Sequence, residues 1–209
     1  HNASYTLGTG NNSDQATFYR VNLPNVIDFH SHHNISLAVT NENKVYIWGY
    51  ESNGCMAGVG TTGTPTHLTA LDGKNIVKVR CGGYSGHAIS SDGKMYSWGK
   101  GQYHAVPDGT SSDVSTPTEM TWFSRKGIKL VDAQFPYDES AACLGLDDQG
   151  NMYVWGVHEH GGIGDYNPQY SYPWPVLLKT NIASITVGRH SCGCIDKFGQ
   201  VYTLSLIHI

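Results

Sequence analysis

The sequence contains few charged residues and no long hydrophobic run. Asp, Glu, Lys and Arg make up 14% of the 209 residues, against roughly 25% in an average soluble domain. Disordered chains are rich in charge and poor in aromatics, whereas this chain has 13 Tyr and 5 Trp. We therefore expect a folded protein. No apolar stretch approaches the roughly 18 residues of a membrane-spanning helix, so we expect no membrane partner.

Positive charge is also scarce. The chain has 13 Lys and Arg against 17 Asp and Glu, which gives a formal net charge of −4 at pH 7. A surface that binds nucleic acid needs clustered Lys and Arg to neutralise phosphates. This balance argues against a nucleic-acid partner.

The motifs that mark common enzyme and cofactor sites are missing. The sequence has no G-x-S-x-G nucleophile elbow, H-E-x-x-H pair, P-loop or dinucleotide fingerprint. The glycines after Trp48 and Trp155 follow expected strands and open no helix, so they lack the helix N-terminus that favours phosphate. We expect no catalytic residue, no cofactor and no enzyme activity.

Cysteine and histidine form no diagnostic metal or redox pattern. The five Cys make no C-x-x-C pair, and we interpret them as small buried thiols, which favours a cytoplasmic or nuclear location. Among the 11 His, His158 and His160 could lie side by side on a strand as metal ligands. No matching Cys, Asp or Glu set accompanies them, so we interpret them as loop residues and predict no metal site. An independent, His-dependent enzyme is the remote alternative.

What the chain does contain is a repeat. An aliphatic residue or Met, then Tyr, any residue, Trp and Gly occurs at 45–49, 95–99 and 152–156, with a truncated copy at 201–203. A turn with Gly or Asn and a small-apolar segment precede each copy, which predicts a β-hairpin. Gly-rich loops follow, and 7–10 has the sequence of such a loop from an earlier copy. A period near 50 residues with several short strands is typical of propeller blades, because such units bury both faces only by stacking.

We therefore predict an all-β fold, a partial β-propeller of roughly 50-residue blades with about three full blades and parts of two more. The repeat region is 1–203. Its copies are anchored near four places: 46–49, 96–99, 153–156 and 202–203. Residues 204–209 interrupt the repeat and resemble the translation of a sequencing-library adapter, so we predict a non-native tail. The alternative is a genuine short apolar terminus.

The repeat resembles that of the regulator of chromosome condensation family. Residues 92–99 (Asp-Gly-Lys-Met-Tyr-Ser-Trp-Gly) are close to the family pattern, and 188–191 (Gly-Arg-His-Ser) resemble its Gly-x-x-His-Ser opening with one residue fewer. The resemblance covers about residues 5–203, although 100–109 lacks the Leu-Gly-x-Gly core of the family's loop. It implies a propeller, in a family whose rings usually have seven blades.

The resemblance also implies a function. It points to a non-catalytic protein-interaction propeller, an adaptor or scaffold, such as the partner-binding arm of a HECT-type ubiquitin ligase with a ubiquitination substrate as partner. The alternative is the founding activity of the family, guanine-nucleotide exchange on a small GTPase. In either case the partner is a protein.

Partner contacts are expected in the longest irregular segments, because propeller blades are occupied by packing. These segments are 100–118, 120–127, 135–140 and 157–172. Aromatic residues beside an Arg, as at 122–125, are typical of binding hot spots. The candidate contact residues are Trp122, Phe123, Arg125, Tyr137, Asp138, Glu139, His158, Asp165, Tyr166 and Tyr170. The alternative for each segment is an ordinary exposed loop.

Overall fold

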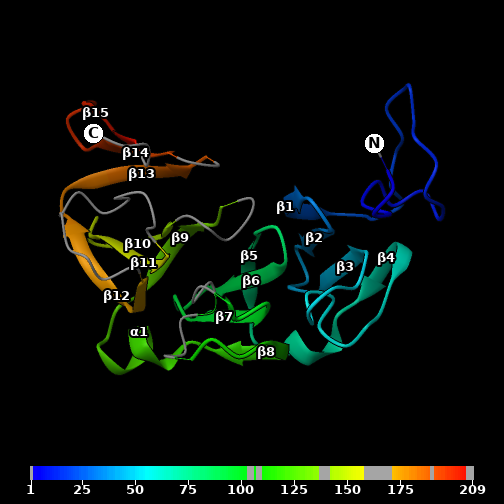
Figure 1. The fold of residues 1–209 in the computed structure, drawn as a ribbon, viewed down its shortest axis with the longest axis horizontal. Coiled ribbons are helices and arrows are strands. Elements are labelled where there is room, and N and C mark those ends of the chain that lie inside the picture. Colours follow the sequence, from blue (N-terminus) through cyan, green and yellow to red (C-terminus); the bar gives the residue numbers. More distant parts are fainter. Residues whose placement is uncertain are drawn as a thin grey trace.

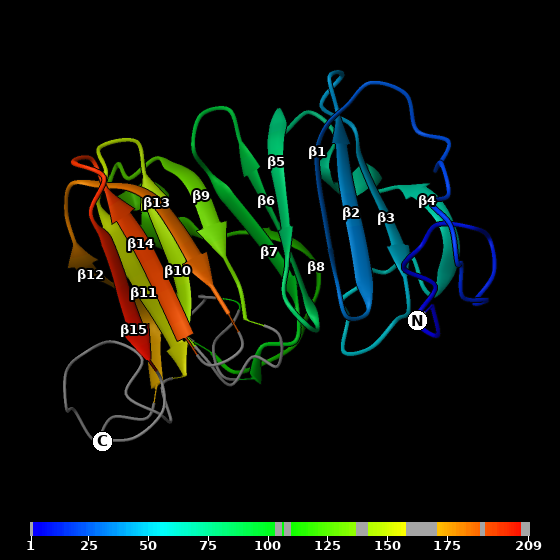
Figure 2. The same cartoon turned by 90° about the horizontal axis from the view of Figure 1, so that it is seen from above.

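Four small antiparallel sheets make up the computed structural model of the chain. It describes residues 2–102, 106, 110–136, 142–157, 171–188 and 191–205. Figure 1 shows the sheets side by side around an arc, with the first strand of each sheet on the inner side, and Figure 2 shows the same arc from above. No helix of the described residues is long and apolar enough to cross a membrane.

Each sheet is one blade, numbered along the chain. Blade 1 contains β1 (Val26–His32), β2 (Ile35–Thr40), β3 (Val45–Gly49) and β4 (Thr62–His67). Blade 2 contains β5 (Ile76–Cys81), β6 (Ser85–Ser90), β7 (Met95–Gly99) and β8 (Val114–Glu119). Blade 3 contains β9 (Leu130–Gln134), β10 (Ala142–Asp147), β11 (Met152–Val157) and β12 (Ser171–Lys179). Blade 4 contains β13 (Ile182–Val187), β14 (Ser191–Asp196) and β15 (Val201–Ser205). Between blades lie the 3₁₀ turn η1 (Thr69–Leu71) and the helix α1 (Thr121–Arg125).

The glycine of each Trp-Gly motif is required by the backbone. Gly49 has a φ of +135°, and a Cβ there would collide with the carbonyl oxygen of Asn34 on the neighbouring strand. Any L-residue would be strained at that φ. The motif therefore combines a large anchor with a close approach of two strands.

The tryptophans of the repeat are buried, and a loop from the preceding copy covers each of the first two. The Nε1 of Trp98 donates to the carbonyl oxygen of Cys55 at 2.8 Å, and the Nε1 of Trp48 donates to that of Thr6 at 2.9 Å. The Nε1 of Trp155 is buried and has no hydrogen-bond partner among the residues that the structure describes. The sequence that precedes blade 3 at the matching place is 100–109, which lacks the usual loop core.

The hydrophobic core lies between consecutive blades. Leu37 and Ile47 of blade 1 pack in one cluster with Val79 and Trp98 of blade 2. The same arrangement recurs between blades 2 and 3 and between blades 3 and 4. Each blade is therefore stabilised by its neighbours, as expected of a repeat architecture.

The predicted all-β propeller is confirmed, with three four-stranded blades and a three-stranded fourth. Three segments predicted as irregular contain regular structure: β8 begins inside 100–118, α1 lies in 120–127, and β12 begins inside 157–172. The outer strands resemble loops in composition because they stand at sheet edges, where Thr, Ser and Pro are tolerated.

The last strand extends beyond the expected end of the repeat. Leu204 and Ser205 belong to β15 and pair with Cys192 and Ser191 of β14. Leu204 is partly buried against the core between blades 3 and 4. The origin of residues 204–209 stays a prediction.

Candidate functional site

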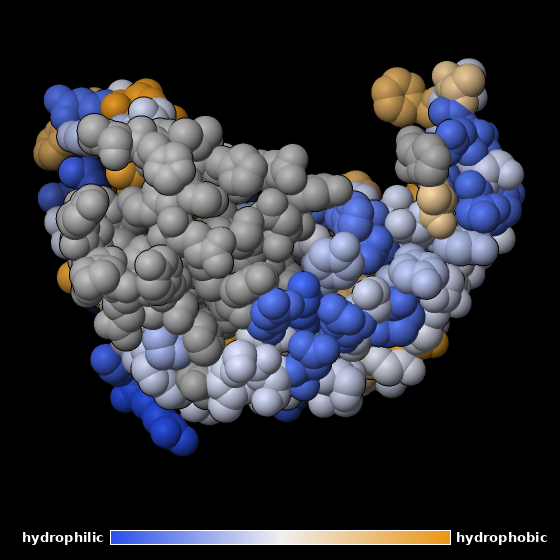
Figure 3. Space-filling view, viewed as in Figure 1, coloured by the Kyte–Doolittle hydropathy of each residue, from blue (hydrophilic) through white to orange (hydrophobic). Residues whose placement is uncertain are grey.

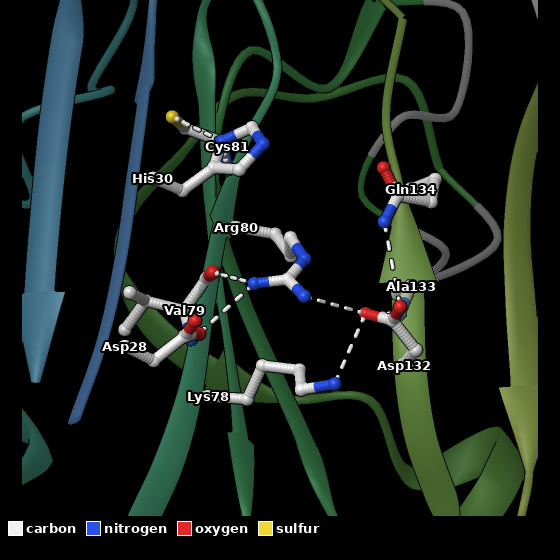
Figure 4. Close-up of polar contacts among 9 residues, drawn as sticks. All are labelled: Asp28, His30, Lys78, Val79, Arg80, Cys81, Asp132, Ala133 and Gln134. Atoms are coloured by element: carbon white, nitrogen blue, oxygen red, sulfur yellow. Dashed lines mark hydrogen bonds and ion pairs between the residues drawn. The ribbon is translucent and has the colours of Figure 1, made fainter. Parts of the chain in front are cut away.

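The first strands of the blades bring polar residues together on the inner side of the arc. Asp28, Lys78 and Asp132 occupy the same register position in β1, β5 and β9, opposite Val39, Ile89 and Leu146 of the second strands. Arg80 lies two residues after Lys78 on the same strand. We call Asp28, His30, Lys78, Arg80 and Asp132 the axial cluster (Figure 4).

Arg80 joins three blades. One of its terminal nitrogens contacts Asp28 Oδ2 of blade 1 at 2.9 Å, and the other contacts Asp132 Oδ1 of blade 3 at 3.0 Å. Lys78 Nζ adds a longer contact to the same Asp132 oxygen at 3.5 Å. The backbone N–H of Val79 also donates to Asp28 Oδ2. The two cations and two carboxylates balance, so this part of the cluster ties blades together and presents no net charge.

His30 completes the axial cluster as a neutral side chain. Burial, the positive charge of Arg80 and the neighbouring His32 lower the pKa of His30 to about 4. Its Nδ1 accepts a hydrogen bond from the backbone N–H of Cys81 and lies 3.1 Å from the Cys81 Sγ. Burial raises the pKa of the Cys81 thiol, so the pair holds neither a thiolate nor a charged base at neutral pH.

A second histidine is enclosed between blades 2 and 3. His87 Nδ1 lies 2.9 Å from Ser97 Oγ, and its Nε2 lies 2.9 Å from Ser85 Oγ. The ring of Phe135 stacks on it at 3.3 Å between centroids. All three polar residues are buried, and burial lowers the pKa of His87 well below its usual value. The hydroxyls and imidazole satisfy one another inside the core, where no substrate reaches them.

The predicted contact residues that the structure describes all lie in helix α1. Trp122 is half-buried, with Lys126 Nζ 4.0 Å from the centre of its ring, and Arg125 is exposed. We call Trp122, Arg125 and Lys126 the α1 patch. Among the described residues, neither cation of this patch has an ion-pair partner. Figure 3 shows strongly hydrophilic atoms projecting where α1 lies in Figure 1.

Phe123 is a correction to the expected contact set. Its side chain is fully buried, edge-on to Tyr153 at 6.0 Å and to Trp155 at 5.7 Å. Within the short helix α1, Phe123 is enclosed in the core, Trp122 is half-buried with one contact edge-on to Tyr153, and Arg125 is exposed. Phe123 therefore anchors the segment and does not contact partners.

The remaining predicted contacts lie outside the described residues. They are Tyr137, Asp138, Glu139, His158, Asp165, Tyr166 and Tyr170. His160, considered above as a metal ligand, lies outside them too. Within the described ranges, no group of three or more His, Cys, Asp or Glu could hold a metal ion.

The sequence reasoning missed the axial cluster. Its signal is the alternation of polar residues, at Asp28 and His30 and again at Lys78 and Arg80. The residues at 28 and 78 are 50 apart, which is the period of the repeat. Reading these positions across copies would have placed them side by side.

Comparisons with known proteins agree with this architecture. The family model for the regulator of chromosome condensation (RCC1) repeat matches residues 92–134, which include β7, β8, α1 and β9. The match indicates no catalytic family, and RCC1-type propellers are typically non-catalytic binding or exchange-factor domains.

Relatives with this repeat are longer than the chain. The human E3 ubiquitin-protein ligase HERC2 is 29% identical over 132 residues, which cover 62% of this chain and 3% of HERC2. The ultraviolet-B receptor UVR8 of Arabidopsis thaliana is 35% identical over 146 residues, which cover 66% of this chain and 31% of UVR8. The chain thus spans less than a third of the length of these two relatives.

A solved structure shows the same fold. Prp20p of Saccharomyces cerevisiae has a TM-score of 0.73 over 98% of this chain and 51% of its own, at 18% sequence identity. The blade order, the buried Trp-Gly anchors and the matched repeat all agree with this likeness. Residues 92–134 match the RCC1 repeat, and the chain folds as consecutive blades of a β-propeller similar to that of Prp20p.

Proposed function

We propose that the chain is a non-catalytic protein-interaction propeller that acts as an adaptor or scaffold. One observation carries this proposal: Cys81 and His87 are enclosed between blades, whereas the α1 patch lies at the surface with Arg125 exposed. Trp122 beside the unpaired Arg125 has the composition of a binding hot spot.

The relatives suggest the larger setting. HERC2 and HERC5 are described as E3 protein ligases, and this chain matches a small part of each. We propose that the propeller is a partner-binding arm of such a ligase, with a ubiquitination substrate as its protein partner, in the cytoplasm or nucleus. This step rests on likeness of fold and sequence, since one propeller fold serves many functions.

A capture experiment with matched variants tests the proposal. The purified chain, the double variant W122A/R125E and the control double variant Y50A/K44E are immobilised, and proteins retained from a cell lysate are quantified by mass spectrometry. Tyr50 and Lys44 are an exposed aromatic and a cation on blade 1. We expect a specific set of proteins to fall at least tenfold with W122A/R125E and to persist with the control.

Direct binding decides the result. A captured protein, purified and titrated by calorimetry, should bind the wild-type chain and the control with equal affinity and bind W122A/R125E at least tenfold more weakly. Equal retention by all three chains would contradict a role for the α1 patch. Turnover of a captured protein by the chain alone would contradict the non-catalytic assignment.

Guanine-nucleotide exchange is the second candidate function. It is favoured by the likeness to Prp20p, whose structure was reported together with its binding to Gsp1p and histones. Release of a fluorescent GDP analogue from purified small GTPases measures this activity directly. Acceleration of tenfold or more would replace the adaptor assignment, whereas a rate unchanged within twofold agrees with it.

A further inference from the structure

The segment between blades 2 and 3 differs from the segment between blades 1 and 2. Both begin with the same backbone hydrogen bond to the first residue of a third strand, donated by Leu68 in one case and by Met120 in the other, at 2.8 Å in both. Blade 2 starts at Ile76, eight residues after Leu68, whereas blade 3 starts at Leu130, ten residues after Met120. The second segment is therefore two residues longer, and α1 takes the place of the 3₁₀ turn η1.

The longer segment is also the more basic of the two. Residues 120–131 contain Arg125, Lys126 and Lys129 but no Asp or Glu. The corresponding residues 68–77 contain one Asp and one Lys. Charge therefore balances in the first segment, whereas the second concentrates three positive charges on a chain whose formal net charge is −4.

The three cations stay unneutralised within the part of the chain that the structure describes. All three are exposed, and in the described ranges no ion pair reaches Arg125, Lys126 or Lys129. The neighbouring carboxylate of Glu119 instead accepts a hydrogen bond from Ser124 Oγ at 2.8 Å. Unpaired cations gathered on a surface raise the local positive potential, which attracts anionic groups.

The core holds the α1 patch in a fixed position. Phe123 is fully buried and lies edge-on to Trp155. The backbone N–H groups of Lys126 and Ile128 both donate to the Phe123 carbonyl oxygen, at 3.1 and 3.0 Å. Gly127, at a φ of +70°, ends the helical turn between them. A surface that is ordered before binding loses little conformational entropy when a partner arrives.

The Trp122 ring is already engaged within the patch. Lys126 Nζ lies 4.0 Å from its centre, and the Tyr153 ring stands nearly perpendicular to it with the centroids 6.1 Å apart. Trp122 is half-buried, whereas Arg125 and Lys126 are exposed. The indole therefore orients the Lys126 ammonium, and positive charge is the main feature that the patch offers to a partner.

We propose that the α1 patch binds an acidic peptide segment of a protein partner, with carboxylates of that segment on Arg125 and Lys126. This inference rests on the proposed function, because it names the chemistry of the partner that the patch would bind. Hydrogen bonds from guanidinium and ammonium groups to carboxylates are about twice as strong as neutral ones. Two adjacent cations of different shape suit neighbouring Asp or Glu side chains on an extended segment.

The surrounding turns favour a short acidic segment over a nucleic acid. A nucleic acid presents phosphates continuously and needs cations along its whole footprint. Lys44 and Lys94, the cations of the turns that join the second and third strands of blades 1 and 2, are paired with Glu42 and Asp92. The cations of the α1 patch therefore do not continue as a row along these turns.

Fluorescence anisotropy with a defined probe tests the proposal. The probe is a fluorescein-labelled peptide of alternating Glu and Ser, and the control peptide has Gln in place of every Glu. We expect the full chain to bind the Glu peptide at least tenfold more tightly than the Gln peptide at about 50 mM salt. Raising the salt to about 300 mM should weaken this binding at least fivefold, because the Debye length shortens.

Matched variants locate the binding on the chain. R125M/K126M removes both charges but keeps most of the aliphatic length, and it should weaken binding of the Glu peptide at least tenfold. The control K44M/K74M removes two other exposed cations, of which Lys74 lies in the corresponding segment and 5.8 Å from the centre of the Tyr96 ring. This control should leave the affinity within twofold. Equal losses in the two variants, or a Glu peptide that binds no better than the Gln peptide, would overturn the proposal.

A partner captured through the α1 patch separates this inference from the proposed function. A partner whose binding is weakened by W122A/R125E but unchanged by R125M/K126M would leave the docking site in place and overturn its acidic ligand. A partner that loses at least tenfold in affinity with R125M/K126M would support the inference. Single-stranded DNA that binds the chain as tightly as the Glu peptide, and is released by R125M/K126M, would overturn it in favour of a nucleic acid.

Discussion

At the scale of single residues, Arg80 shows how one side chain connects three repeats. Its guanidinium contacts Asp28 of blade 1 and Asp132 of blade 3, and the Arg80 side chain is 13% exposed. Removing the guanidinium leaves the partly buried Asp28 without a counter-charge and Asp132 with only its longer contact to Lys78, which is destabilising even where the ion pairs themselves contribute little.

Replacing Arg80 with Met should therefore lower the free energy of unfolding by about 1–3 kcal/mol. The aliphatic part of the side chain is kept, so the loss reports on the charge. Urea unfolding followed by tryptophan fluorescence measures it as a lower midpoint with an unchanged slope. R125M is the matched control on the surface and should change the free energy by less than about 0.5 kcal/mol; equal effects of the two substitutions would show that the axial contacts carry no stability.

At the scale of the blade, residue 204 occupies the position that holds a tryptophan in the other copies of the repeat. Leu204 follows Tyr202 by two residues, which is the place that Trp48, Trp98 and Trp155 occupy after their own tyrosines. A hollow of about 350 Å³ lies beside it, lined by residues of blades 3 and 4 that include Leu144, Met152, Cys192, Cys194, Tyr202 and Leu204.

Replacing Leu204 with Trp should fill this hollow and stabilise the chain by about 0.5–2 kcal/mol, as cavity-filling substitutions commonly do. Differential scanning calorimetry measures the gain as a higher melting temperature. Val201→Trp, at an exposed position of β15 that does not line the hollow, adds the same ring elsewhere on the strand and should give no gain. A lower melting temperature for L204W would mean that blade 4 does not use the anchor of the other blades.

Much of each blade follows from the sequence, because hairpins depend on local patterns. The Tyr-x-Trp-Gly copies and the turns before them predicted β2–β3, β6–β7 and β10–β11. The outer strands were missed because Thr62–His67 and Val114–Glu119 lack an apolar face. Phe123 was predicted as a contact residue, but it is buried. The composition of a hot spot does not show which side chains of a short helix face the core.

The candidate site was harder to predict than the fold for a physical reason. Arg80 meets Asp28 and Asp132 only after three blades have stacked, and that contact is set by the packing between blades. Two of the three residues of the α1 patch, Trp122 and Arg125, were predicted, because aromatic and cationic neighbours are visible in the sequence. Its third member, Lys126, was identified from its position over the Trp122 ring.

At the scale of the whole molecule, the two buried histidines make stability depend on pH. The pKa of His30 is lowered to about 4, and that of His87 is lowered well below its usual value, in both cases chiefly by burial. In the unfolded chain both have ordinary values near 6.5. Below that pH the unfolded chain binds protons that the folded chain does not.

Stability should therefore be constant between about pH 7 and 8 and fall as the pH drops from about 6.5 towards 4. Melting temperatures across this range measure the decline. H87F, which can stack on Phe135 without a titrating group, should give a shallower decline than the wild type. A melting temperature independent of pH between 7 and 5 would contradict the burial of neutral histidines between blades.

The covering of Trp48 and Trp98 by loops from the preceding copies gives the first blades a direction along the chain. Thr6 is synthesised before Trp48, and Cys55 before Trp98. A ribosome releases the chain from its N-terminus, and early segments fold first. The acceptors of Trp48 and Trp98 are therefore synthesised before these two indoles, so the first blades can form one repeat at a time before the later blades have been synthesised.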